Sequence, residues 1–156
     1  MTTADSRTLR ETFCRVIETA AFLCGEPVAK GDVGKTPEDA VCARMRFSGD
    51  LTGSIAVAAP APLAPLIAAN MLGVEPDASE ARDRSNDAFR EMVNVLCGQV
   101  LAAMTDGRGR FGLSVPELSY LHPAGWQAIL DRPGTMAFRA EGVPILLEVQ
   151  AQGDRA

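Results

Sequence analysis

Residues 40–59 constrain the fold most strongly, because two alternating segments lie on either side of a short turn. In AVCARMRF the apolar residues of one face are Val41, Ala43, Met45 and Phe47. A Ser-Gly-Asp turn follows, and in the next segment, LTGSIAVAA, apolar residues again recur on one face with the spacing of a strand. Alternation with a period of two is typical of a strand that has one buried face. The stretch 40–59 therefore predicts a β-hairpin.

The segments on either side of this hairpin have helical periods. Asp5 and Ser6 are capping residues before an apolar pattern that predicts a first helix ending at Gly25. Residues 28–39 are polar and contain glycine, which indicates a loop. After the hairpin, a short apolar helix is expected from near Pro62 to Gly73, followed by an acidic linker over 74–82.

A longer helix is predicted over residues 83–107, with Asp83 or Ser85 as its N-cap. The segment 110–121 is expected to be extended and interrupted at Pro116, and a loop should run through residues 122–126. Residues 135–140 and 143–151, joined by a Glu-Gly pair, predict a closing hairpin.

These elements predict an α+β fold in which helices pack on an antiparallel sheet. The expected order is one helix, two strands, two helices, and then two or three strands. A chain of 156 residues that is 47% hydrophobic has the size of one globular domain. We therefore expect a single domain over residues 1–156.

Charge and hydropathy argue against several functions. The net charge is −5 and the basic residues are scattered, so no basic face for a nucleic acid is expected. No apolar stretch reaches the roughly 18 residues that a membrane span needs. The N-terminal residues are polar and lack the apolar core of a signal peptide, which predicts a cytoplasmic protein.

The cysteines and the one histidine do not form a metal-binding pattern. Cys14, Cys24, Cys42 and Cys97 are isolated in the sequence, which predicts buried, reduced thiols rather than disulfides or a zinc site. His122 is followed by proline and is expected in a loop. The stretch 29–36, AKGDVGKT, ends like a phosphate-binding loop, but Ala29 stands where that motif needs glycine, and a strand is expected next instead of a helix.

The stretch DAFREMVN, residues 87–94, lies in the long predicted helix and raises the main question about function. At ~100° per residue, with Phe89 at zero, Val93 and Leu96 fall on the core side. On the same scale, the opposite side carries a single stripe, formed by Asn94 at ~140°, Asp87 at ~160°, Gly98 at ~180° and Glu91 at ~200°. Glycine inside a helix costs about 0.5–1 kcal/mol relative to alanine, and close approach of another chain is one reason to keep it.

Two interpretations of this stripe are open. Polar residues on the wet face of a helix are common and need no function. Alternatively, the Glu91 carboxylate could pair with a lysine of a partner, while the Asn94 amide, a donor and an acceptor, could hold and aim a water molecule. Neither side chain is a nucleophile, so the stripe suits positioning chemistry on the surface of another molecule.

The spacing of Asp87, Glu91 and Asn94, with Pro116 after 21 intervening residues, resembles the motif of the CheC/CheX family of chemotaxis phosphatases. That gap is one residue shorter than the usual one. The order of elements is also similar along nearly the whole chain. One motif is present, which favours the single-motif, CheX-like form over the duplicated form.

The resemblance implies a phosphatase that acts on the aspartyl phosphate of a phosphorylated CheY-type response regulator. The residue matching Glu91 would pair with the regulator's lysine, and the residue matching Asn94 would orient the attacking water. Asp87, Gly98 and Pro116 would contact the partner. Mg²⁺ would be held by the regulator, with no cofactor on this chain, and a homodimer is expected.

Two other functions remain open from the sequence. The first is a non-catalytic module of the same fold that binds a response regulator or a flagellar-switch protein. The second is a small-molecule hydrolase, for which neither a nucleophile–base pair nor a metal site is evident. The cognate regulator, its pathway and the role of Asp87 cannot be read from the sequence.

Overall fold

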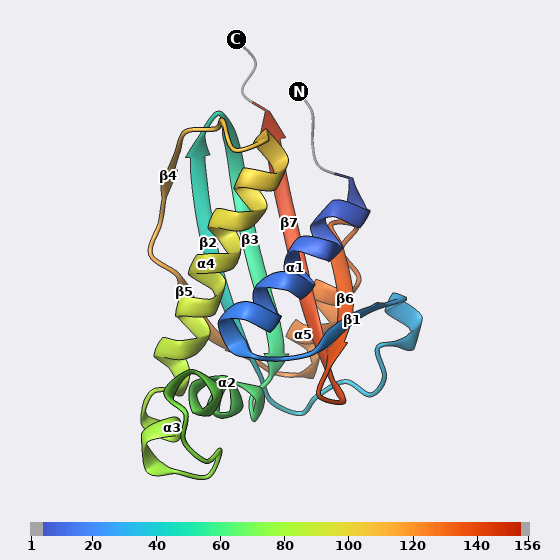
Figure 1. Ribbon diagram of the computed structural model, residues 1–156. Coiled ribbons are helices and arrows are strands. Elements are labelled where there is room, and N and C mark those ends of the chain that lie inside the picture. Colours follow the sequence, from blue (N-terminus) through green and yellow to red (C-terminus); the bar gives the residue numbers. More distant parts are fainter. Residues whose placement is uncertain (1–4, 154–156) are drawn as a thin grey trace.

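The computed structural model describes residues 5–153, and within them the strands form one antiparallel sheet (Figure 1). The strands are β1 (Gly25–Val28), β2 (Ala40–Gly49), β3 (Leu51–Pro60), β4 (Phe111–Leu113), β5 (Glu117–Leu121), β6 (Thr135–Ala140) and β7 (Val143–Gly153). Their spatial order is β1-β6-β7-β3-β2-β4, and β5 also pairs with β2. The outer edge of β2 therefore carries two short strands, joined by residues 114–116.

Helices cover the two faces of this sheet unequally. They are α1 (Ser6–Ala21), α2 (Leu63–Leu72), α3 (Ser79–Asp83), α4 (Ser85–Thr105) and α5 (Pro123–Leu130), with a short 3₁₀ turn, η1 (Lys30–Asp32). Figure 1 shows α1 and α4 across one face and α5 on the other. The α+β class with an antiparallel sheet is thus confirmed.

The alternation of side chains along β2 explains why both faces need cover. Val41 and Met45 join the large core under α1, α2 and α4. Cys42 points the other way and packs with Trp126 and Ile129 of α5. The start of β2 is apolar on both faces because α5 covers that half, whereas Arg44 lies in the polar part of the same face.

The first helix begins as predicted and ends earlier. The Asp5 carboxylate accepts a hydrogen bond from the Thr8 amide at 2.8 Å, which caps α1. Phe22 then turns the chain in the left-handed conformation, with φ of 56°, so the predicted end at Gly25 is wrong. Gly25 instead begins β1, where a side chain would collide with Ile17.

Three further expectations about local structure are corrected. The predicted linker 74–82 contains the start of α3, and the predicted loop 122–126 contains the start of α5, with His122 at its N-cap and Pro123 in its first turn. The cap of α4 is also different: α3 leads directly into α4, so Arg84 is the N-cap, and the Ser85 hydroxyl donates to the Arg82 carbonyl.

The hairpins and the extended segment are confirmed. The first hairpin pairs Ala40 to Phe47 with Pro60 to Gly53. Glu141 and Gly142 both have positive φ, of 51° and 77°, as a two-residue turn between antiparallel strands requires. None of the helices within residues 5–153 is long and apolar enough to cross a lipid bilayer.

The cysteines differ in their environments. Cys42 and Cys97 are buried free thiols, as predicted, and burial raises the pKa of Cys97 to about 11. The prediction is wrong for Cys24, which is exposed, because α1 ends before it; Cys14 is only half-buried.

Candidate functional site

Helix α4 presents the predicted stripe to solvent. Phe89, Val93 and Leu96 are buried in the core. The four residues on the opposite side are all exposed: Asp87, Glu91, Asn94 and Gly98. The angular prediction therefore places these residues correctly.

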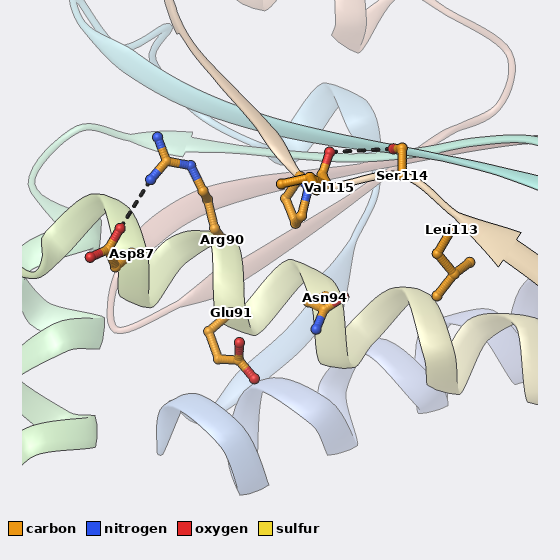
Figure 2. A pocket seen from close by; sticks show the side chains of 8 residues that line it. Asp87, Arg90, Glu91, Asn94, Leu113, Ser114 and Val115 are labelled. Carbon is orange, nitrogen blue, oxygen red and sulfur yellow. Dashed lines mark hydrogen bonds and ion pairs between the residues drawn. The ribbon is translucent and has the colours of Figure 1, made fainter.

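The stripe borders an open groove of about 370 Å³ between α4 and the segment that joins β4 to β5 (Figure 2). The lining residues come from α4, from the last residue of β4 and from the joining segment, and they are Asp87, Arg90, Glu91, Asn94, Leu113, Ser114, Val115 and Pro116. Pro116 lies 22 positions after Asn94 in the sequence and yet lines the same groove. The shorter gap thus still brings Pro116 to the site.

Hydrogen bonds to β2 fix the far wall of the groove. The Ser114 amide donates to the Arg46 carbonyl at 2.9 Å, and the Arg46 amide donates to the Ser114 hydroxyl at 2.8 Å. Val115, 79% exposed, follows without being drawn into the core. The wall therefore presents an apolar side chain from an anchored backbone.

Glu91 and Asn94 are available to an external partner. Neither side chain makes a hydrogen bond or ion pair with another residue in the described part of the chain. Figure 2 shows Arg90 and Glu91 pointing to opposite sides of α4, with Asn94 one turn farther along the helix and directed between them. A carboxylate, an amide and a guanidinium thus follow one another across the exposed surface.

Arg90 is a groove residue that sequence reasoning missed. Its Nη1 donates to Asp87 Oδ1 at 3.1 Å, an ion pair between positions three apart on the helix. Opposite charges at this spacing are neighbours on a helix. That spacing, together with the position of Arg90 one turn before Asn94, is the signal that could have identified it.

Gly98 is exposed but lies outside this groove. It lines a second groove of about 270 Å³ farther along α4, which shares Leu113 with the first. A Cβ added at Gly98 would meet no atom within 4 Å, so packing inside the chain does not require glycine there. The helical cost of this glycine has no internal compensation.

Two other sequence features are not part of the site. Residues 29–36 lie in the connection from β1 to β2, and no α-helix follows them before β2, so the geometry of a phosphate-binding loop is missing. His122 is exposed at the start of α5. Among residues 5–153, no group of three or more His, Cys, Asp or Glu could hold a metal ion.

Solved structures of other proteins share this fold. Chemotaxis protein CheX from Desulfovibrio desulfuricans is 19% identical, with a TM-score of 0.68 over 94% of this chain and 98% of that chain. The CheX–CheY–BeF3–Mg²⁺ complex from Borrelia burgdorferi matches at 13% identity, with a TM-score of 0.64 over 94% and 96%. FliY from Thermotoga maritima matches at 13% identity, with a TM-score of 0.53 over 94% and 84%. At these identities the likeness establishes a CheX-like fold.

The family follows from the sequence match. The family described as chemotaxis phosphatase CheX matches residues 41–124, more than half of the chain, and this stretch contains Glu91, Asn94 and Pro116. The chain belongs to the CheX chemotaxis phosphatase family. No curated protein sequence matches it.

Proposed function

We propose that this protein hydrolyses the aspartyl phosphate of a CheY-type response regulator. Membership of a chemotaxis phosphatase family supports a hydrolase, and a structural neighbour is a CheX–CheY complex. The observation that carries the proposal is the pair Glu91 and Asn94, exposed side by side on α4 and without partners among the described residues.

In the proposed reaction, α4 docks on the regulator so that Asn94 reaches the phosphorylated aspartate. The Asn94 amide oxygen accepts a hydrogen bond from a water molecule and directs the water oxygen at phosphorus. The new P–O bond forms as the bond to the aspartate oxygen breaks; the aspartate leaves as a carboxylate and the water proton passes to the phosphate or to solvent. Such catalysis depends on positioning rather than on a covalent intermediate.

Glu91 has a different role in this proposal. Its carboxylate pairs with the lysine beside the regulator's phosphorylation site, which fixes the orientation of the two proteins. The Mg²⁺ ion is expected on the regulator. Gly98, with open space above it, gives the partner room to approach the helix, and Pro116 contacts the partner from the opposite wall.

The proposal is tested by following phosphate loss from a phosphorylated CheY-type regulator with wild type and Asn94→Ala. We expect wild type to shorten the lifetime of the phosphoryl group and the variant to leave it close to the spontaneous value. Gln99→Ala is a matched control, because Gln99 is exposed on α4 but lies ~140° away around the helix. Equal activity of wild type and Asn94→Ala would refute the assignment.

The non-catalytic module remains the alternative to be excluded. The likeness to FliY concerns the fold and does not decide between the two functions. Binding of a regulator without any change in its phosphate lifetime would favour the binding module.

The homodimer stays a prediction, and light scattering of the protein as it elutes from a size-exclusion column would test it.

A further inference from the structure

Arg90 and Asn94 line the same groove and lie about one helical turn apart on α4. On the helix, Arg90 is at ~100°, Asn94 at ~140° and Glu91 at ~200°, so Asn94 is flanked by a cation and an anion. Figure 2 shows the same order, with Arg90 and Glu91 directed to opposite sides. A phosphoryl group above Asn94 would have Glu91 on one side and Arg90 on the other.

We infer that Arg90, oriented by Asp87, donates hydrogen bonds to the phosphoryl oxygens of the docked regulator. This inference rests on the proposed function. It gives Arg90 the task of distinguishing the phosphorylated regulator from the unphosphorylated one, and it gives Asp87 the task of holding Arg90.

The charges of the groove support this assignment. The groove residues include two carboxylates, Asp87 and Glu91, and one cation, Arg90. Carboxylates repel a phosphoryl dianion at short distance, and the repulsion grows when docking excludes water. A guanidinium on the other side of Asn94 offsets that repulsion and matches phosphate oxygens in geometry.

The hydrogen bonding of Arg90 leaves it free for this role. Within residues 5–153, its side chain donates one hydrogen bond, from Nη1 to Asp87. The guanidinium has further N–H groups, and its side chain is 38% exposed at the groove. Asp87 therefore holds one end of the fork while the other donors stay available to a ligand.

The alternative is that the Asp87–Arg90 ion pair only stabilises the helix and takes no part in binding the regulator. Pairs at this spacing stabilise helices slightly. Arg7 and Glu11 form a comparable exposed pair at 3.0 Å on α1, away from the groove, so Arg7→Met is a matched control. A purely structural pair would affect stability in both variants and would not respond to the state of the regulator.

The experiment measures the affinity of the full chain for a CheY-type regulator that wild type dephosphorylates. The regulator is used in two forms, with Mg²⁺ alone and with Mg²⁺ plus BeF₃⁻, which mimics the phosphoryl group. For Arg90→Met we expect roughly a 10- to 100-fold loss with the BeF₃⁻ form, the range for a hydrogen bond between charged groups. Affinity for the Mg²⁺ form should change less than about twofold.

Two further variants sharpen the test. Arg90→Lys should recover part of the lost affinity because it keeps the charge without the planar fork. Asp87→Asn should reduce the preference for the BeF₃⁻ form only a few-fold, roughly the effect of losing an exposed pair. Thermal unfolding of each variant checks that the fold is intact.

The inference is overturned if Arg90→Met weakens both regulator forms equally, since Arg90 would then contact an acidic side chain of the partner. It is also overturned if Arg90→Met behaves like Arg7→Met. These results differ from failure of the proposed function, in which wild type itself would not shorten the phosphate lifetime.

Discussion

Two clusters of acidic and basic side chains lie on opposite faces of the sheet. One cluster is exposed to solvent, whereas the other is arranged around a buried carboxylate. On α4, the Asp87–Arg90 pair is exposed, with side chains 68% and 38% accessible, and Glu91 beside it has no partner among the described residues. On the face shared with α5, Glu148 is 0% exposed and accepts hydrogen bonds from Arg44 at 2.8 Å and Arg132 at 3.0 Å.

Strand register explains how the buried cluster forms. Arg44 on β2 and Glu148 on β7 both lie opposite Ala56 on the strand between them. The small Ala56 side chain leaves room for the ion pair to span β3. A carboxylate withdrawn from water needs such partners inside the chain, whereas an exposed carboxylate does not. A carboxylate that is both buried and paired thus stabilises the fold, whereas an exposed carboxylate without an internal partner is available to bind another protein.

The largest expected effect is on the exposed side. Asn94→Ala should reduce phosphatase activity about 100-fold or more, because the water is no longer held in line with phosphorus. The free energy of unfolding should stay within about 0.5 kcal/mol of wild type, since Asn94 is exposed and makes no internal hydrogen bond. Stopped-flow measurement of phosphate release checks the activity, and urea unfolding checks the stability. A large loss of stability would show that Asn94 also stabilises the fold, against the contrast drawn between the exposed and the buried clusters.

Periodicity predicted the long elements of the fold because each has one strongly apolar face. The elements that it missed are short and depend on contacts distant in sequence. β1 has 4 residues and pairs with β6, while α5 has 8 residues and is held by Trp126 and Ile129 against the sheet. Local patterns carry little information about such segments, because tertiary packing decides their conformation.

The buried cluster should give the next largest effect. Glu148→Ala should lower the free energy of unfolding by about 2 kcal/mol, less than for a fully buried pair, because Arg44 and Arg132 lose their counter-charge but are still 27% and 44% exposed to water. Activity per folded molecule should be unchanged well below the melting temperature. Urea unfolding measures the effect, and Glu117→Ala is the control: its pair with Arg46 is exposed at 4.0 Å, so a change below about 0.5 kcal/mol is expected. If both variants lowered the free energy of unfolding equally, the buried and the exposed ion pairs would not differ in their contribution to stability.

The two clusters also differ in how far the sequence reveals them. The stripe on α4 could be predicted, because its residues follow one helix and their relative directions depend only on helical geometry. The burial of Glu148 could not, since its arginine partners are 104 and 16 residues away and the strand register decides their meeting. Arg90 lay within reach of the helical argument, but the groove wall at Leu113 and Val115 depends on pairing between β4 and β2.

Glu91→Gln should have a smaller effect than Asn94→Ala. Losing the charge but keeping the shape should raise KM roughly 10-fold, the size expected for one charge-assisted hydrogen bond, with a smaller change in kcat. Because the lost interaction is between charges, wild-type activity should fall faster than that of the variant as salt increases. Steady-state kinetics at two salt concentrations test this; an unchanged KM would show that Glu91 does not take part in docking.

The smallest expected effect, at Gly98, changes stability and docking in opposite directions. Gly98→Ala should raise the free energy of unfolding by about 0.5–1 kcal/mol, because alanine favours the helix and the added methyl meets no atom of this chain. If the regulator approaches this surface closely, the same methyl should weaken docking roughly fivefold, equivalent to ~1 kcal/mol of strain. Urea unfolding gives the sign of the change in stability, and regulator affinity measured on the same preparation gives the sign of the change in docking. A more stable variant that binds as well as wild type would show that the partner does not reach Gly98, and would limit the interface to the groove between Asp87 and Pro116.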